Sequence, residues 1–248
     1  MTAPTFVLVH GAWHGGWCWR AVAQRLLATG ARVHMPTLTG LGERAHLHEP
    51  VPGLYTHIDD VAGLIETEEL EDVVLVGHSY AGMVITGVAD RLAGRVRHLV
   101  YLDAAVPRDG DDFISQHPGL DQAAATQRRQ ALTDLADGTG WLPPYPPDVM
   151  GVTDPATAAW LRRRLRPHPL RSWLEPLRMT HSGGAMIPRT YVLATDPPTE
   201  AMGYPLHGAQ ARDNAEWHYR EIACGHNMMV IDPAATSEIL RQAVEEQR

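Results

Sequence analysis

The sequence is poor in the features that mark several classes of protein. It has 248 residues but only two cysteines, Cys18 and Cys224, which excludes a framework of disulfides and favours reduced thiols. No apolar run approaches the ~20 residues that a membrane-spanning helix needs. No HExxH or similar spacing occurs among the 14 histidines, so no metal site is expected. The first residues show no charged leader followed by an apolar core, so we expect a cytoplasmic protein without a signal peptide.

Positive charge is also scarce. The formal net charge is −8 at pH 7, and the one basic run, 162–164, fits the solvated face of a short helix. Nucleic acid and membrane surfaces are therefore not expected partners.

Hydrophobic residues make up 44% of the chain, which is enough for the core of one α/β domain with an insertion. Nothing in this composition implies a cofactor.

Short apolar runs alternate with helical patterns along most of the chain. A helix is expected over 58–69, with Asp59 and Asp60 in its first turn, and another over 233–246. Strands are predicted at 5–9, 32–35, 73–76, 96–102, 189–194 and 217–222. This alternation predicts an α/β fold with a mostly parallel sheet of about six strands and flanking helices. Catalytic groups should lie beyond the carboxyl ends of the strands.

The segment 107–187 breaks the alternation. Its stretch 141–147 (WLPPYPP) contains four prolines, a density that central strands do not tolerate. We interpret 107–187 as an inserted helical cap over the sheet edge, and 1–106 together with 188–248 as the core. The competing interpretation is a structural excursion that does not contact a ligand.

The stretch 77–82 (GHSYAG) directly follows the apolar run 73–76. A buried strand that breaks into a small-residue turn around one serine, and then continues as an amphipathic helix, is the layout of a nucleophile elbow. The usual pattern is G-x-S-x-G, and Ala81 differs from its last glycine by one methyl group. Ser79 is therefore the candidate nucleophile.

A serine hydroxyl needs an imidazole to take its proton and a carboxylate to orient that imidazole. His226 is the candidate base, because it lies in the loop between the last predicted strand and the closing helix. His10, His14 and His78 lie on turns, where we expect them to shape the loops by hydrogen bonding.

The stretches 7–17 (VLVHGAWHGGW) and 75–79 (LVGHS) resemble the α/β-hydrolase superfamily, and within it the plant methylesterases, plant hydroxynitrile lyases and small bacterial carboxylesterases. The resemblance covers the predicted sheet and not the cap, and it implies the α/β-hydrolase fold. It also implies that the backbone amides of Ala12 and Tyr80 form an oxyanion hole. Acyl transfer needs two such fixed donors, because charge develops on the carbonyl oxygen.

The resemblance leaves two candidates for the triad acid. In the plant enzymes the acid follows the strand before the histidine strand, where Asp196 is the nearest carboxylate, although Pro197 aligns with their acid position. Certain haloalkane dehalogenases carry the acid one strand after the elbow strand, where this chain has Asp103. An aspartate that closes a buried apolar strand needs a partner, and an imidazole supplies one. We favour Asp103 and keep Asp196 as the alternative.

Other positions narrow the reaction. Hydroxynitrile lyases use a threonine and a lysine where this chain has Gly11 and Asn227, and epoxide hydrolases and dehalogenases use an aspartate at the elbow. We therefore predict a serine hydrolase that cleaves a carboxylic ester, lactone or thioester of a small, mostly apolar molecule through an acyl-enzyme. The side chains expected at the substrate pocket are Trp13, Trp141, Tyr145 and Trp160.

The alternative function is a non-hydrolytic protein of the same fold. It would be a small-molecule receptor, or a lyase or cyclase of natural-product metabolism. The expected partner is a small-molecule ester. The sequence leaves open whether the protein is a monomer or a homodimer.

Overall fold

The computed structural model describes residues 3–181 and 183–245. Within these ranges six strands form one sheet, in the order β2-β1-β3-β4-β7-β8, and every pairing is parallel. The strands are β1 (Thr5–Val9), β2 (Arg32–His34), β3 (Val73–His78), β4 (Val96–Leu102), β7 (Arg189–Ala194) and β8 (Trp217–Ile222). The predicted parallel sheet is therefore confirmed.

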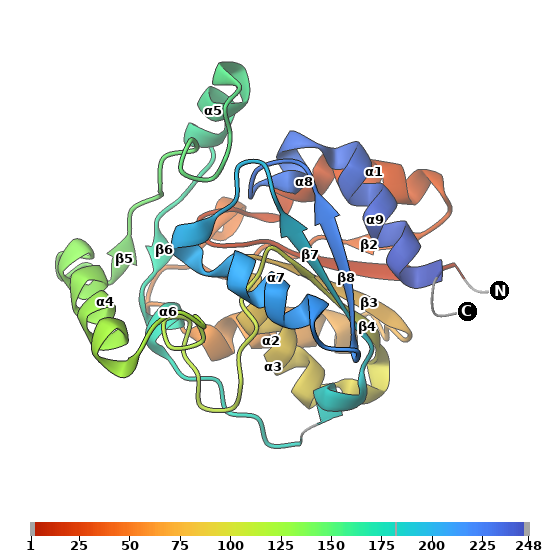
Figure 1. Cartoon of the computed structure of the whole chain (residues 1–248), viewed down its shortest axis with the longest axis horizontal. Helices are drawn as coiled ribbons and strands as arrows, with labels where there is room; N and C mark the ends of the chain where they lie inside the picture. The colour runs from red at the N-terminus through yellow and green to blue at the C-terminus, as the bar shows by residue number, and fades with distance from the viewer. Residues whose placement is uncertain (1–2, 182, 246–248) are drawn as a thin grey trace.

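Helices cover both faces of this sheet (Figure 1). One face carries α1 (Arg20–Ala28), α8 (Met228–Ile231) and α9 (Pro233–Glu245), and the other carries α2 (Leu54–Thr67), α3 (Ala81–Arg91) and α7 (Tyr204–Arg212). Short 3₁₀ helices span Gly16–Trp19, Gly42–Arg44, Ala93–Arg95, Gly183–Met186 and Glu200–Met202.

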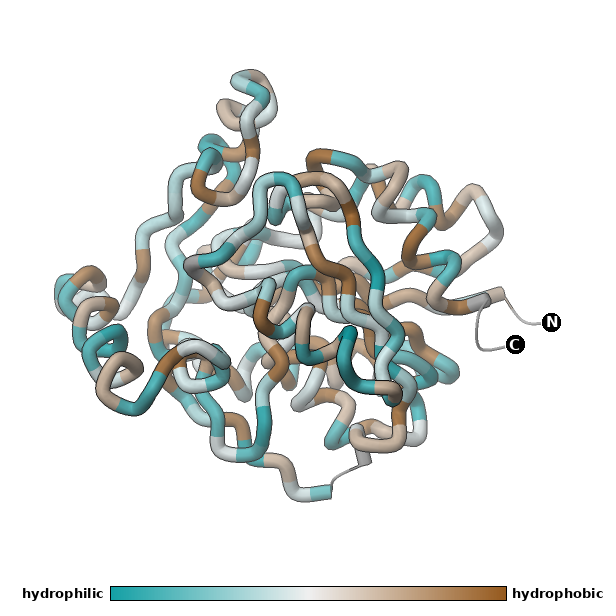
Figure 2. The backbone as a smooth tube through the Cα atoms, viewed as in Figure 1, coloured by the Kyte–Doolittle hydropathy of each residue, from teal (hydrophilic) through white to brown (hydrophobic). Residues whose placement is uncertain are grey.

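Alternate residues of each central strand belong to two different hydrophobic layers. Phe6 and Leu8 pack in the layer of α1 and α9, whereas Val7 and Val9 pack in the layer of α2 and α3. Because both faces are covered, the central strands β1 and β3 are mostly apolar, as Figure 2 shows for the middle of the molecule, whereas the edge strand β8 is partly exposed and carries polar side chains. Among the described helices, none is both long and apolar enough to cross a membrane.

The helix predicted over 58–69 begins earlier than expected. It starts at Leu54 and ends at Thr67, so Asp59 and Asp60 lie beyond its first turn and the prediction of an acidic first turn is wrong. Asp60 instead accepts hydrogen bonds from the Thr39 backbone N–H at 2.6 Å and hydroxyl at 2.8 Å, and pairs with Arg44 at 3.0 Å. Its charge therefore holds the loop after β2. In the last predicted helix, residue 246 lies outside the described residues.

The segment 107–187, which we predict to be a cap, lies between β4 and β7. It contains α4 (Gln122–Leu135), α5 (Pro155–Arg162), α6 (Arg171–Leu174) and a two-stranded antiparallel sheet of β5 (Trp141–Leu142) and β6 (His168–Pro169). Figure 1 shows α4 and α5 at the outside of the molecule, beyond the layers that enclose the sheet. The division of the chain into core and cap stays a prediction.

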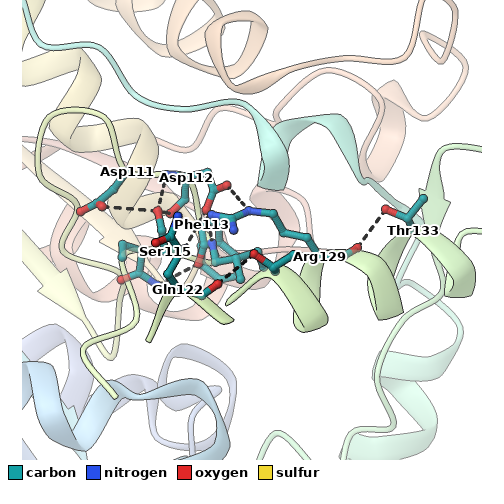
Figure 3. A network of polar contacts seen from close by, with 10 residues as sticks. Asp111, Asp112, Phe113, Ser115, Gln122, Arg129 and Thr133 are labelled. Carbon is teal, nitrogen blue, oxygen red and sulfur yellow. Dashed lines mark hydrogen bonds and ion pairs between the residues drawn. The ribbon is translucent and has the colours of Figure 1, made fainter. Parts of the chain in front are cut away.

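A polar network connects α4 to the loop before it (Figure 3). Asp112 accepts hydrogen bonds from Arg129 Nε at 2.7 Å and from the backbone N–H groups of Ile114 at 3.0 Å and Ser115 at 2.7 Å. Asp112 is buried, and a buried carboxylate is stable only when it is paired and hydrogen-bonded. This network therefore fixes α4 in place.

Candidate active site

Ser79 lies at a sharp turn between β3 and α3. Its φ is +58°, in the left-handed region that non-glycine residues rarely adopt. Its backbone N–H donates to the Leu102 carbonyl at 3.2 Å, and its carbonyl accepts from Gly82 and Ala105, each at 3.1 Å. A Cβ atom on Gly82 would overlap the Ala105 carbonyl oxygen, so only glycine allows the turn to pack this closely. This strand–turn–helix geometry agrees with a nucleophile elbow.

His226 and Asp103 form a buried pair at the same edge of the sheet. His226 Nδ1 lies 2.6 Å from Asp103 Oδ2, and Asp103 is 0% exposed. The other carboxylate oxygen, Oδ1, accepts from the Ala194 backbone N–H at 3.3 Å. A ring N–H donates to a carboxylate oxygen, so Nδ1 of His226 carries a proton here and Nε2 is left for another partner.

Asp196 does not contact this pair. Its side chain is exposed beyond β7, and its backbone N–H donates to the Cys224 carbonyl at 3.2 Å. The structure thus brings Asp103, and not Asp196, against His226.

Tyr204, the first residue of α7, is a residue of this site that the sequence analysis missed. Its hydroxyl lies 3.0 Å from Ser79 Oγ, and its ring stacks on His226 with centroids 5.1 Å apart and planes 7° apart. Among the described residues, no hydrogen bond joins Ser79 to His226, a geometry often seen before substrate binds. No motif or spacing in the sequence marks Tyr204, because the fold of the loop before it brings it here.

His78, the residue before Ser79, connects the elbow to the loop of His226. Its Nε2 lies 2.9 Å from the His226 carbonyl oxygen and therefore donates to it. Burial, followed by the neighbouring imidazoles of His226 and His14, holds the pKa of His78 well below its usual value, so its ring is neutral. His10 and His14 likewise bond backbone carbonyls, those of Gly11 and Ala12, at 2.8 and 2.7 Å.

The backbone N–H groups of Ala12 and Tyr80 are the candidate oxyanion donors. Across residues 3–181 and 183–245, neither donates a hydrogen bond to a protein acceptor. The Tyr80 side chain is held by His57, whose Nδ1 lies 2.9 Å from the Tyr80 hydroxyl. His57 Nε2 lies 3.0 Å from the Thr39 carbonyl and must donate there, so its Nδ1 accepts from Tyr80.

Trp13, which follows Ala12, is held by the segment 107–187. Its backbone N–H donates to His168 Nδ1 at 3.5 Å, its carbonyl accepts from the Arg166 N–H at 3.0 Å, and its indole N–H donates to the Leu142 carbonyl at 3.2 Å. Its φ is +64°, a conformation that a bulky residue keeps only when its surroundings enforce it. The loop that carries Ala12 therefore depends on this segment for its shape.

The tautomer of His168 suits this contact. The Ser172 hydroxyl donates its proton to the Pro169 carbonyl at 2.8 Å, so it can only accept from His168 Nε2 at 2.9 Å. His168 Nδ1 is then an acceptor, as the Trp13 N–H requires. Burial is the main cause that holds the pKa of His168 well below its usual value and keeps the ring neutral.

The same segment also touches the loop of His226. A Cβ atom on Gly225 would lie 2.6 Å from the Gly151 carbonyl oxygen, so the two loops approach as closely as glycines allow. Segment 107–187 therefore contacts the loops on both sides of Ser79.

Ser79 and His226 line a cavity of about 540 Å³. Its other walls are mostly apolar, with one positive and one negative side chain, and they consist of Trp13, Arg128, Tyr145, Val149, Met150, Pro198, Thr199, Glu200 and Met202. The rings of Trp13 and Tyr145 lie 4.6 Å apart. The structure thus brings two of the four expected aromatic residues to the site.

The other two, Trp141 and Trp160, do not line this cavity, contrary to our expectation. Trp141 borders a separate depression of about 230 Å³ beside Gly40, and Trp160 packs edge-on against Trp17 at 5.0 Å in another groove. Aromatic content led us to predict a cap, but the short elements of segment 107–187 have no periodicity that tells which side chains face Ser79.

Comparison with known proteins agrees with this geometry. The model of the alpha/beta hydrolase family matches residues 6–239. A carbendazim hydrolyzing esterase of Nocardioides sp. (strain SG-4G) is 43% identical over 240 residues, which cover 95% of this chain and 97% of that protein. Methylesterase 10 of Arabidopsis thaliana is 38% identical over 104 residues, which cover 41% of this chain and 38% of that protein.

A solved structure extends the likeness to the whole fold. It is an extracellular alpha/beta-hydrolase from a Paenibacillus species, described as sharing structural and functional homology with tobacco Salicylic Acid Binding Protein 2. It is 25% identical, with a TM-score of 0.82, and the match covers 97% of this chain and 98% of that chain. The predicted fold and the predicted resemblance to methylesterases and bacterial esterases are confirmed, and the chain belongs to the alpha/beta hydrolase family.

Proposed function

We propose that this protein is a serine carboxylesterase in which Ser79 is the nucleophile, His226 the general base and Asp103 the acid that orients His226. The observation that carries the assignment is the 2.6 Å contact between His226 Nδ1 and Asp103, beside the elbow that carries Ser79. The relatives support the reaction, because two of them are esterases.

Acylation follows from the positions of these groups. His226 Nε2 takes the proton of Ser79 while Oγ attacks the carbonyl carbon of the ester. The N–H groups of Ala12 and Tyr80 donate to the carbonyl oxygen as it becomes negative, a contribution of about 2.7–4 kcal/mol for each donor. His226 then gives the proton to the leaving oxygen, the C–O bond breaks, and an acyl group stays on Ser79.

Deacylation repeats these steps with water. His226 Nε2 takes a proton from a water molecule that adds to the acyl carbon, and the same two backbone donors stabilise the second oxyanion. The bond between the acyl carbon and Ser79 Oγ then breaks, and His226 returns the proton to Oγ. The carboxylic acid leaves and the serine hydroxyl is restored.

The cavity favours small, mostly apolar esters. Trp13, Tyr145, Val149, Met150 and Met202 supply apolar surface, as ligand pockets of this size usually do. The two charged lining residues, Arg128 and Glu200, have opposite signs, so the walls do not favour a charged substrate of either sign. We infer that neutral aromatic and medium-chain acyl esters are better substrates than succinyl or phosphate-bearing esters.

Hydrolysis of p-nitrophenyl butyrate tests the proposal. The wild-type enzyme should show steady turnover, and Ser79→Ala should lower kcat by ~10⁴-fold or more, since the triad acts as a unit. Ser237→Ala is the matched control, because Ser237 lies on α9 and its hydroxyl donates to the Ala234 carbonyl at 2.9 Å, away from Ser79. If Ser79→Ala keeps more than about a twentieth of kcat, Ser79 is not the nucleophile.

The non-hydrolytic alternative makes a different prediction for the same assay. A receptor would bind its ligand tightly and turn over model esters very slowly, whereas the esterase relatives favour steady hydrolysis. The cytoplasmic location stays a prediction, and one relative of known structure is an extracellular protein. The oligomeric state stays open as well, and gel filtration of the purified chain decides it.

A further inference from the structure

We propose that Tyr204 is a further catalytic residue, whose hydroxyl speeds hydrolysis of the acyl-enzyme by donating a hydrogen bond to Ser79 Oγ as this oxygen departs. This inference rests on the proposed serine-esterase function. It starts from the 3.0 Å distance between the Tyr204 hydroxyl and Ser79 Oγ, together with the stacking of the Tyr204 ring on His226.

The position of Tyr204 is fixed on several sides. The side chain is 0% exposed, and its ring lies 5.1 Å from that of His226 with the planes only 7° apart. Its carbonyl oxygen lies 3.2 Å from the Tyr191 hydroxyl, which is also 3.2 Å from the Ala104 carbonyl. A phenol enclosed in this way cannot turn aside, so its hydroxyl stays beside Ser79 throughout the reaction.

The direction of this hydrogen bond follows from the chemistry of Ser79. During acylation Ser79 gives its only hydroxyl proton to His226, so Tyr204 must be the donor between the two oxygens. Burial is the main cause that raises the pKa of Tyr204 well above its usual value. The phenol therefore keeps its proton and acts as a neutral donor, never as a base.

The strength of the hydrogen bond changes along the reaction. A free serine hydroxyl and a departing serine oxygen are good acceptors. In the acyl-enzyme, by contrast, the lone pair of Oγ is delocalised into the carbonyl group, which makes Oγ a poor acceptor. An interaction accelerates a step only if it is stronger in the transition state than in the state before it. Tyr204 therefore accelerates deacylation, and it has little effect on acylation, where the bond is already present in the free enzyme.

The atoms of this step balance without another reactant. Water adds to the acyl carbon and gives one proton to His226 Nε2, after which the bond between the acyl carbon and Oγ breaks. The proton on His226 passes to Oγ, and Tyr204 keeps its own proton from beginning to end. The products are a carboxylic acid and the free serine.

Tyr204→Phe tests the inference, because it removes the hydroxyl and keeps the ring that stacks on His226. The experiment is rapid-mixing hydrolysis of p-nitrophenyl butyrate, in which the burst reports acylation and the steady phase reports deacylation. We expect the steady phase to slow about tenfold while the burst rate constant stays within about twofold of wild type. Since kcat falls and kcat/KM does not, KM should fall about tenfold as well.

A direct readout accompanies the kinetics. Mass spectrometry of acid-quenched enzyme should find a larger fraction of butyryl adduct on Ser79 in Tyr204→Phe than in wild type. The burst and steady phases, normalised to the burst amplitude, are rate constants of the folded enzyme, so a smaller folded fraction does not alter them.

Tyr101→Phe is the matched control. It removes another buried tyrosine hydroxyl, which lies on β4 and pairs with the Thr86 hydroxyl at 2.9 Å, and not with Ser79 or Tyr204. Its ratio of burst to steady rate constants should equal that of wild type. If Tyr204→Phe lowers kcat and kcat/KM equally and accumulates no adduct, the role of Tyr204 is overturned while the esterase assignment stands. If wild type shows no hydrolysis that depends on Ser79, it is the proposed function that fails.

Discussion

The carboxylate of Asp103 meets the imidazole of His226 at 2.6 Å although 123 positions of sequence separate the two residues. Asp103 follows β4 and His226 follows β8, and in the sheet β7 lies between these two strands. Groups beyond the carboxyl ends of parallel strands converge at one edge of a sheet. The two side chains therefore meet across the end of β7, beside the elbow of Ser79.

This pair makes a prediction about the triad acid. Asp103→Asn should lower kcat for p-nitrophenyl butyrate by about 10⁴-fold, because an amide favours the wrong histidine tautomer and leaves the imidazolium unpaired. Asp196→Asn is the comparison, and it should change kcat less than twofold because Asp196 is exposed. Steady-state kinetics of both variants give the answer.

Thermal unfolding provides the control for that experiment. Asp103 is fully buried and also accepts from the Ala194 N–H, a bond that asparagine can retain. The variant should therefore still fold, with a lower Tm. A large loss of kcat in Asp196→Asn, with Asp103→Asn active, would instead support the arrangement of the plant enzymes.

A second prediction concerns the contact between segment 107–187 and the loop that carries the proposed oxyanion donor Ala12. His168→Leu removes the acceptor of the Trp13 N–H, so the neighbouring Ala12 N–H should lose its alignment. We expect kcat to fall about tenfold, less than the 10²–10³-fold of a deleted oxyanion donor. Enzyme assays with a neutral aryl ester measure the effect.

His98→Leu is the matched control for His168→Leu. His98 is also buried, but it lies on β4 and bonds Thr190 at 2.8 Å. Both variants should lose stability, and only His168→Leu should lose kcat in its folded fraction. Equal kcat in the two variants would show that the segment does not hold the oxyanion loop.

A third prediction concerns the walls of the cavity. Tyr145→Ala removes an aromatic wall that packs on Trp13, so kcat/KM for benzoyl esters should fall up to about tenfold. Trp160→Ala should leave it unchanged, because Trp160 lies in a different groove. A series of acetyl, butyryl and benzoyl esters measures both variants. A larger effect of Trp160 than of Tyr145 would place the substrate elsewhere.

A fourth prediction concerns stability in acid. Burial lowers the pKa of His10 from 6.5 to about 3, and the pKa values of His14 and His57 from 6.5 to about 4. Between pH 6.5 and about 4, the unfolded chain therefore binds protons that the folded chain does not. The free energy of unfolding is fully present above pH 6.5 and should fall as pH falls, by up to ~1.4 kcal/mol per pH unit for each histidine.

Urea unfolding at about pH 7 and about pH 5 measures this dependence. His57→Gln should reduce the difference between the two conditions, since it removes one of the histidines whose pKa is depressed by folding. An unfolding free energy that stays constant or rises on acidification would contradict the prediction.

Local patterns in the sequence were sufficient to predict the parallel sheet and the sharp turn at Ser79. Four strands, β1, β4, β7 and β8, agree with their predicted ranges residue for residue. Most of β1, β4 and β7 is apolar because both faces of these strands are buried, whereas the edge strand β8 is partly exposed and carries polar side chains. Ser79 could be predicted as the candidate nucleophile because a strand, a small-residue turn and a helix follow each other within a short stretch. The start of α2 was missed, because the burial of Leu54 and the contacts of Asp60 are tertiary.

Only the tertiary structure decided which groups join Ser79. Asp103 and Asp196 both follow strands at the same sheet edge, and the path of the loop around His226 selects between them. Tyr204 reaches Ser79 across 125 positions. Hydrophobic periodicity records whether a side chain is buried, but it carries no information on which distant partner buries it. For the same reason Tyr145 faces the cavity and Trp160 does not, although both lie in one aromatic segment.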